Sequence, residues 1–305
     1  MSTRLLVVGE ALVDIVVDRE GEAAEHVGGS PANVAVGLAR LDHPVDFATW
    51  LGRDDRGRRI TDHLERHGVH VLPESFGSSP TSTAVATLDA SGAASYDFDL
   101  HWDLPSFALP GGTGHVHTGS IATVLLPGAD SVTEALAAVR EQGTVSYDPN
   151  IRPSIMGDLD AVRRRVEELV ALSDVVKASE DDLALLYAGR STDEVLDHWL
   201  GLGALLAVVT LGGDGTAYRV TGSPDAARAR TLAERVVDTV GAGDSFMAGL
   251  VSGLVVAGLL GDPAARERLR HATLDDVKPA IKRGLATSGV TVGKAGAYAP
   301  SLDEL

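Results

Sequence analysis

A glycine-rich turn that ends in an acidic residue occupies residues 238–246. Gly241, Ala242 and Gly243 carry little or no side chain, so their backbone amides can approach an anion closely. The residues from 246 to 260 are apolar or small almost throughout and predict a buried helix, whose N-terminus favours anions. Asp244 falls in the first helical turn, where a carboxylate is stabilised. A carboxylate beside an anion site suits a base that takes a proton from a hydroxyl attacking a phosphoryl group.

A second glycine-rich segment, residues 28–33, precedes another predicted helix. Ser30 has the residue type of a helix N-cap, and the proline after it suits the first position of a helix that runs to about residue 41. Asn33 lies in the first turn, near the backbone of Gly28 and Gly29, where it offers donors and acceptors for sugar hydroxyls. Both glycine segments also fit plain helix capping, so neither motif establishes a function by itself.

The composition is that of a soluble globular protein with a large core. Of the 305 residues, 44% are apolar, and no apolar run has the length and character of a membrane span. The net charge of −17 argues against nucleic acid or an anionic membrane as a partner. The absence of cysteine excludes disulfides, cysteine-ligated zinc and thiol catalysis, and it is compatible with the cytoplasm, where we expect the protein to reside.

Alternating strand and helix patterns predict an α/β fold with three α/β/α layers. Residues 45–51 are predicted as one strand, and residues 159–172 as a helix. Two half-polar strands at 83–88 and 93–98, joined by a turn at 89–92, predict a hairpin appended to the parallel sheet.

Polar residues and glycines follow several predicted strands, and this is where α/β proteins bind ligands. Arg152 lies beyond a strand that ends at residue 147 and is a candidate phosphate contact. Thr210 ends another strand and precedes a glycine loop at 212–215. Asp14 follows the first strand, either as an edge-strand charge or as a ligand of a polyhydroxylated substrate, and its local sequence alone favours the edge-strand charge.

One histidine pair, His115 and His117, has the spacing of two metal ligands on a strand. No third ligand is evident in the sequence, so we expect no metal there.

Together, the two glycine motifs resemble the signatures of the pfkB family of carbohydrate kinases, which have the ribokinase-like fold. Residues 28–33 resemble the N-terminal signature, and residues 238–249 resemble the C-terminal signature, which is the more specific of the two. Residues 9–14 and 147–153 resemble the bacterial fructokinase branch in particular.

The resemblance spans nearly the whole chain. It implies a single kinase domain over residues 1–305, with a ribokinase-like core and a small β-sheet lid over the sugar. We expect the lid to be formed by approximately residues 10–28 and 78–102.

The resemblance also implies a reaction, in which ATP phosphorylates a primary sugar hydroxyl with Mg²⁺ as cofactor. Asp244 matches the family's general base, and the glycine turn before it matches the anion hole. The residues that match catalytic positions are Gly241, Ala242, Gly243, Asp244 and Arg152. We assign sugar binding to Asp14, Gly28, Gly29 and Asn33. We assign nucleotide binding to Lys177, Thr210, Gly212, Gly213 and Gly215.

The chain departs from the family at one motif, an Asn-x-x-Glu segment linked to Mg²⁺ and phosphate. Here Ser179 stands in place of the asparagine and Asp182 in place of the glutamate. We expect Asp182 to keep the carboxylate role toward Mg²⁺. Members of the family often use K⁺ near the anion hole, and Asp238 is the candidate for such a site here.

Fructose is the favoured acceptor, and ribose, 2-keto-3-deoxygluconate, tagatose phosphate and nucleosides are alternatives within the family. The acidic residues Asp97, Asp99 and Asp103 in the lid segments favour an unphosphorylated sugar. A non-catalytic sugar or nucleotide sensor is the alternative from another class, and the presence of Asp244 argues against it. We expect no nucleic acid or membrane partner, and a homodimer through the lid if the lid exposes an apolar face.

Overall fold

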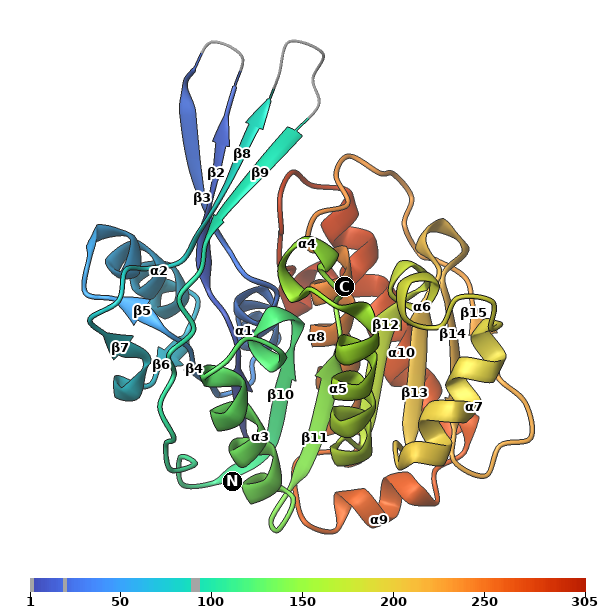
Figure 1. Cartoon of the computed structure of the whole chain (residues 1–305). Helices are drawn as coiled ribbons and strands as arrows, with labels where there is room; N and C mark the ends of the chain where they lie inside the picture. Colours follow the sequence, from blue (N-terminus) through green and yellow to red (C-terminus); the bar gives the residue numbers. More distant parts are fainter. Residues whose placement is uncertain (1–2, 19–20, 89–93) are drawn as a thin grey trace.

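The computed structural model describes residues 3–18, 21–88 and 94–305 (Figure 1). Within these residues the central element is a nine-stranded sheet. Its strands, in spatial order, are β15 (Ala227–Ala229), β14 (Thr216–Val220), β13 (Leu206–Thr210), β12 (Val175–Ser179), β11 (Thr144–Asp148), β10 (Thr113–Gly119), β1 (Arg4–Val8), β4 (Val45–Ala48) and β6 (Val69–Val71). The β13–β14 and β14–β15 pairs are antiparallel, and the others are parallel.

Helices cover both faces of this sheet, which confirms the predicted three layers (Figure 1). One layer contains α1 (Ser30–Arg40), α8 (Ala242–Val256) and α10 (Leu274–Val292). The other contains α3 (Gly128–Val139), α5 (Leu159–Leu172) and α7 (Thr192–Leu202). The remaining helices of the described residues are α2 (Asp55–Arg66), α4 (Pro153–Met156), α6 (Glu180–Leu186) and α9 (Ala265–Arg270). Single 3₁₀ turns occupy Pro73–Ser75, Ser120–Thr123, Gly212–Asp214 and Leu302–Glu304.

Two apolar clusters join the sheet to these helical layers. In β1, Leu5 and Val7 face α1 and α8, whereas Leu6 and Val8 face the opposite layer. All four side chains are fully buried, as expected for a parallel strand that is covered on both faces.

A separate small sheet projects from the end of the molecule at which the carboxyl ends of the parallel strands lie (Figure 1). Its strands, in spatial order, are β3 (Ala23–Gly28), β2 (Leu12–Val17), β8 (Thr83–Leu88) and β9 (Ala94–Asp99). The antiparallel β8–β9 pair confirms the predicted hairpin strands, while the predicted turn at 89–92 lies outside the described residues.

The prediction of one strand over residues 45–51 is wrong. Strand β4 ends at Ala48, and Leu51 begins β5 (Leu51–Gly52), which pairs with β7 (Phe76–Gly77) in a third sheet. The backbone N–H of Thr49 donates to Ser75 Oγ, 3.1 Å away, and so leaves the ladder of the large sheet.

Helices α1 and α8 lie side by side with their N-termini at the same end. A glycine in α1 allows the two helices to approach closely. A Cβ atom at Gly37 would lie 2.6 Å from the Cβ of Ala248. The buried helix predicted at 246–260 starts earlier, at Ala242, and its N-cap is Gly241, with a φ of 74° that favours glycine. This packing places the first turns of the two helices next to each other.

Candidate active site

A cavity of about 740 Å³ lies where the carboxyl ends of β11, β12 and β13 approach the small sheet. Leu12, Ala84 and Phe98 line it from the small sheet, and Asp148 and Lys177 line it from the large sheet. Open α/β sheets typically bind ligands at this position. The predicted site residues that line the cavity are Asp14, Gly29, Asn33, Arg152, Lys177, Asp182, Thr210, Gly212, Gly241, Gly243 and Asp244.

Asp244 lies in the first turn of α8, and α1 holds its carboxylate. Ser30 Oγ donates to Asp244 Oδ1 over 2.6 Å, and Asn33 Nδ2 donates to Asp244 Oδ2 over 2.8 Å. The prediction that Ser30 caps α1 is wrong, because Gly29 is the N-cap and no side chain of the described residues caps this helix. The hydroxyl of Ser30 is directed at Asp244 instead.

Lys177 is the buried cation at the glycine turn. Its Nζ lies 2.7 Å from Asp148 Oδ2, and it donates to the carbonyl oxygen of Gly243 over 3.4 Å. Burial opposes the charged form of Lys177, but Asp148 outweighs this effect, so the pKa of Lys177 is raised. Burial raises the pKa of Asp148 to about 6 against the attraction of Lys177, with Asp182 and Asp244 adding to the rise. The Lys177 ammonium is therefore charged and fixed beneath the turn.

Asp182 is largely occupied by structural hydrogen bonds. Its Oδ1 accepts from the backbone of Ile151 at 2.7 Å, and its Oδ2 accepts from both the backbone and the hydroxyl of Ser179. Ser179 is the N-cap of α6 and forms a capping box with Asp182. The Ser179 substitution thus preserves a helix start and fixes the loop that leads to Arg152.

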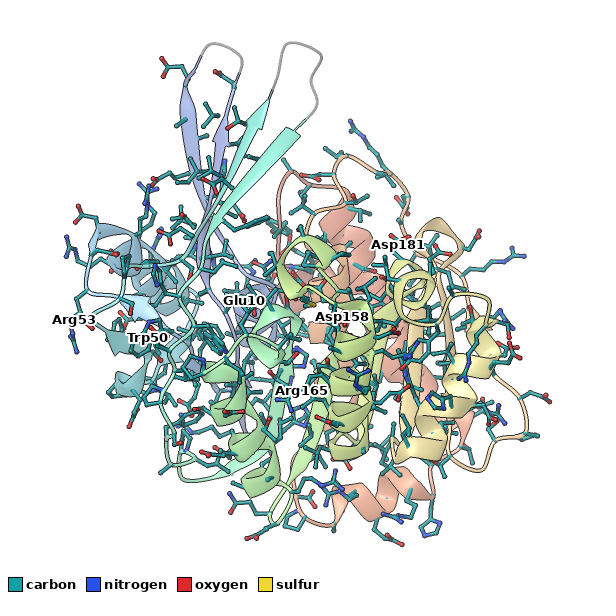
Figure 2. All side chains as sticks on the ribbon, viewed as in Figure 1. Glu10, Trp50, Arg53, Asp158, Arg165 and Asp181 are labelled. Atoms are coloured by element: carbon teal, nitrogen blue, oxygen red, sulfur yellow. The ribbon has the colours of Figure 1, made fainter. Side chains whose placement is uncertain are left out.

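Glu10, which is labelled in Figure 2, lines the cavity, and the sequence prediction did not assign it to the site. The side chain is only 6% exposed, and its Oε2 accepts from the backbone N–H of Ala122 at 3.2 Å. Burial raises the pKa of this carboxyl to about 7. An acidic residue inside an apolar run, 5–17, was the available signal. Asp148 was also missed, although it lies within the fructokinase-like segment.

Several predicted residues lie away from this cavity. Ala242 belongs to the first turn of α8 but is not among the lining residues. Gly28 and Asp238 line a neighbouring cavity of about 920 Å³. Gly213 and Gly215 lie outside both, and Gly215 has a structural reason to be glycine, since a Cβ there would lie 2.1 Å from the carbonyl oxygen of Ala229.

Asp238 ties the segment before the glycine turn to the C-terminal residues. Its Oδ1 accepts from the backbone of Val240 at 3.0 Å, and its Oδ2 accepts from the backbone of Gly296 at 2.8 Å. These two hydrogen bonds lower the pKa of the Asp238 carboxyl. The carboxylate is therefore ionised at neutral pH and connects the segment before the glycine turn to the segment around Gly296.

The acidic residues of β9 do not face this cavity. Phe98 lines the cavity, and because strand neighbours point to opposite faces, Asp97 and Asp99 point away from it. Asp103 accepts a hydrogen bond from Ser79 on the surface. The charge argument for an unphosphorylated sugar therefore cannot rest on these three residues.

The histidine pair belongs to the core. His115 contacts Thr144 and Ser146 through its two ring nitrogens, and His117 contacts the same Ser146. Burial lowers the pKa of each histidine to about 3, so both are neutral. Across the described ranges, no three acidic, histidine or cysteine side chains gather in a geometry that could hold a metal ion. None of the helices in those ranges is both long and apolar enough to span a bilayer.

The fold and this cavity agree with the family comparison. The model of the pfkB family carbohydrate kinases matches residues 2–304. The chain belongs to this family, and it is a sugar kinase by class.

Individual relatives give a narrower comparison. A fructokinase of Klebsiella pneumoniae is 35% identical over 281 residues, which cover 87% of this chain and 89% of that protein. A fructokinase of Salmonella typhimurium is 32% identical over 286 residues, with 88% and 89% covered. The solved structure of a fructokinase double mutant from Vibrio cholerae, with fructose, ADP and a potassium ion bound, has a TM-score of 0.81 and 28% identity, over 99% of this chain and 96% of that one.

Proposed function

We propose that this protein is an ATP-dependent fructokinase, which transfers the γ-phosphoryl group to a primary hydroxyl of unphosphorylated fructose. The observation that carries the proposal is the position of Asp244 in the first turn of α8, inside the cavity that also contains Asp14 and Asn33. One helix start thus supplies a base and an anion site beside a polar sugar cavity. The fructokinases at 35% and 32% identity support fructose as the acceptor.

The proposed mechanism relies on alignment and charge stabilisation. Phosphoryl transfer has a loose transition state, so the attacking hydroxyl loses its proton late and a carboxylate of ordinary basicity suffices. Asp244 accepts this proton. The first-turn amides of α8, together with Lys177, stabilise negative charge on the transferred group. Asp14, Gly29 and Asn33 border the sugar end of the cavity, and the positive charge of Arg152, which also lines the cavity, acts on Asp14.

The cavity fits a nucleotide phosphate chain with a divalent cation. Asp148 is 2% exposed, lines the cavity, and its Oδ1 has no hydrogen-bond partner among the described residues. Both oxygens of Asp182 already accept from the protein. We therefore propose that Asp148 faces the Mg²⁺ ion of the nucleotide and that Asp182 supports the loop behind it. The ion would neutralise charge on the phosphates.

The charges around the sugar end of the cavity favour an unphosphorylated acceptor. Glu10, Asp14 and Asp244 contribute carboxyl groups there. Among the described residues that line the cavity, the cationic side chains are Arg152 and Lys177. Lys177 is held by Asp148 at the nucleotide side. A phosphate group already present on the acceptor sugar would face more acidic than basic side chains.

Three further assignments belong to the proposal. A K⁺ site beside Asp238 would use the segments that this carboxylate joins, and the potassium-bound Vibrio cholerae fructokinase supports it. A homodimer would form through the small sheet, where Val16 is 38% exposed. The chain contains no cysteine and is strongly acidic, in keeping with residence in the cytoplasm.

The proposal is tested by measuring ADP release from Mg-ATP with fructose, ribose, 2-keto-3-deoxygluconate, tagatose phosphate and a nucleoside. We expect the highest kcat/KM with fructose. Turnover with another acceptor would replace fructose and keep the kinase assignment. No turnover with any acceptor, while ATP still binds, would contradict the assignment and favour a sensor.

A further inference from the structure

Two side chains of α1 contact the proposed base from one face of the helix. Ser30 and Asn33 are three residues apart in the first turn, so their side chains are neighbours. Ser30 Oγ lies 2.6 Å from Asp244 Oδ1, and Asn33 Nδ2 lies 2.8 Å from Asp244 Oδ2. Each oxygen of the carboxylate therefore accepts one hydrogen bond from α1. Hydrogen bonds to an ionised acceptor are among the stronger ones in proteins.

Ser30 is not needed to start the helix. Gly29 is the N-cap, with a φ of 108°, and its carbonyl oxygen accepts from the backbone N–H of Asn33 at 3.0 Å. The hydroxyl of Ser30 donates its hydrogen bond to Asp244, 214 residues away in the chain. Its removal should leave α1 intact.

The first turn of α1 is itself held firmly. Pro31 packs on the end of β1, where a Cβ at Gly9 would lie 2.2 Å from Pro31 Cγ. Further along, Gly37 lies against Ala248 of α8. Two donors on such an anchored turn fix the plane of the carboxylate and oppose its rotation.

The carboxylate keeps room for the substrate. An ionised carboxylate offers about four acceptor positions, and Ser30 and Asn33 use two of them. A hydroxyl that approaches from the cavity can use another. The direction from which it can be deprotonated is then set by the plane that α1 imposes.

We propose that Ser30 is a positioning residue for the base, and that Asn33 shares this role besides facing the sugar. This inference rests on the proposed kinase function. Ser30 acts through Asp244, so loss of its hydroxyl lowers the fraction of complexes in which the base and the sugar hydroxyl are aligned. We expect kcat to fall on the order of 10-fold, less than the 10²-fold that a full 1 Å misplacement can cost. The KM values for fructose and ATP should change little.

A double-mutant cycle tests this inference. The variants are Ser30→Ala, Ser30→Thr, Asp244→Asn and Ser30→Ala combined with Asp244→Asn, and kcat and both KM values are measured for each. The cycle separates an effect through Asp244 from a general structural effect. Ser191→Ala is the matched control, since Ser191 also stands at a helix start but bonds Glu194 on the surface. Thermal melting of each variant checks the fold.

The inference predicts that Ser30→Ala lowers kcat, that Ser30→Thr recovers part of it because the hydroxyl is kept, and that Ser30→Ala has no further effect in the Asp244→Asn background. The Ser191→Ala control should match the wild type in kcat and in both KM values. An unchanged kcat in Ser30→Ala, an equal loss in the Asp244→Asn background, or an effect confined to the fructose KM would each overturn it. Absence of wild-type turnover would overturn the kinase function, and this inference with it. A normal wild type with an unaffected Ser30→Ala would overturn this inference alone.

Discussion

Glu10, Asp148 and Asp244 occupy one cavity but have different surroundings. Burial raises the pKa of Glu10 to about 7. Burial also raises the pKa of Asp148 to about 6, although Lys177 opposes the rise. Asp244 is held by a serine and an asparagine. Of the three, Asp244 lines the cavity, accepts a hydrogen bond on each of its oxygens and lies at a helix N-terminus. Its surroundings therefore fit the role of the general base.

Glu10 should give the protein a pH-dependent stability. Its pKa is about 7 in the folded protein against 4.5 ordinarily, so between these values the folded protein binds more protons than the unfolded chain. Its contribution to the free energy of unfolding should therefore decrease as pH rises from about 4.5 to about 7. At 1.36 kcal/mol per pKa unit this amounts to about 3 kcal/mol.

Urea unfolding of the wild type and Glu10→Gln at pH 5 and pH 8 measures this contribution. The difference in unfolding free energy between the two proteins should shift in favour of Glu10→Gln at pH 8. The same difference at both pH values would show that Glu10 does not titrate in this range.

Asn33 makes a residue-scale prediction that separates its two roles. Asn33→Ala removes both a sugar-side group and one donor to Asp244, so the fructose KM should rise and kcat should fall. Steady-state kinetics with each substrate varied in turn provide the measurement. A change confined to the ATP KM would show that Asn33 lies on the nucleotide side of the cavity and that the proposed position of the sugar is wrong.

At the scale of elements, local sequence patterns identified most of the framework. The helix predicted at 159–172 is α5 with the same bounds, because its apolar residues recur at helical spacing. The strand predicted at 45–51 is interrupted because Thr49 bonds to Ser75, a contact 26 residues away. A residue pattern in one segment contains no information on such a contact.

For the candidate site as well, local patterns predicted residues but not the contacts between distant segments. The glycine motifs predicted Asp244 and Asn33 as site residues, but the hydrogen bond between them depends on the packing of α1 against α8. Ser30 has the residue type of a cap, and only the position of Asp244 shows why its hydroxyl serves elsewhere. The sequence does not show which face of β9 covers the cavity, so it cannot show that Asp97 and Asp99 point away from it.

The Lys177–Asp148 pair makes a prediction at the element scale, because it joins β11 and β12 beneath α8. Lys177→Met would leave the Asp148 carboxylate buried without its partner, and breaking such a pair costs about 3–5 kcal/mol. Denaturant unfolding near pH 8 measures the loss. Adding Asp148→Asn removes the unpaired charge and should recover part of the stability. If the double variant is no more stable than Lys177→Met, the loss of stability does not come from an unpaired Asp148 carboxylate.

At the scale of the whole molecule, the large sheet and the small sheet approach each other at the carboxyl ends of the parallel strands (Figure 1). Segments far apart in the chain therefore contribute to one cavity. The small sheet, α1, β12 and α8 all line this cavity. We propose that the small sheet and α1 border the sugar, and that β12 and α8 border the phosphate groups. We propose that the small sheet acts as a lid over the sugar, which would exclude water from the transferred phosphoryl group.

The most direct test of the account is fructose phosphorylation by Asp244→Asn, with ATP binding measured on the same sample by calorimetry. The substitution keeps the shape of the side chain and removes the proton acceptor. We expect kcat to fall by at least about 100-fold, the low end for a positioned general base, while the dissociation constant for ATP stays close to that of the wild type. Near-normal turnover in Asp244→Asn would contradict the assignment of Asp244 as the base and the mechanism built on it.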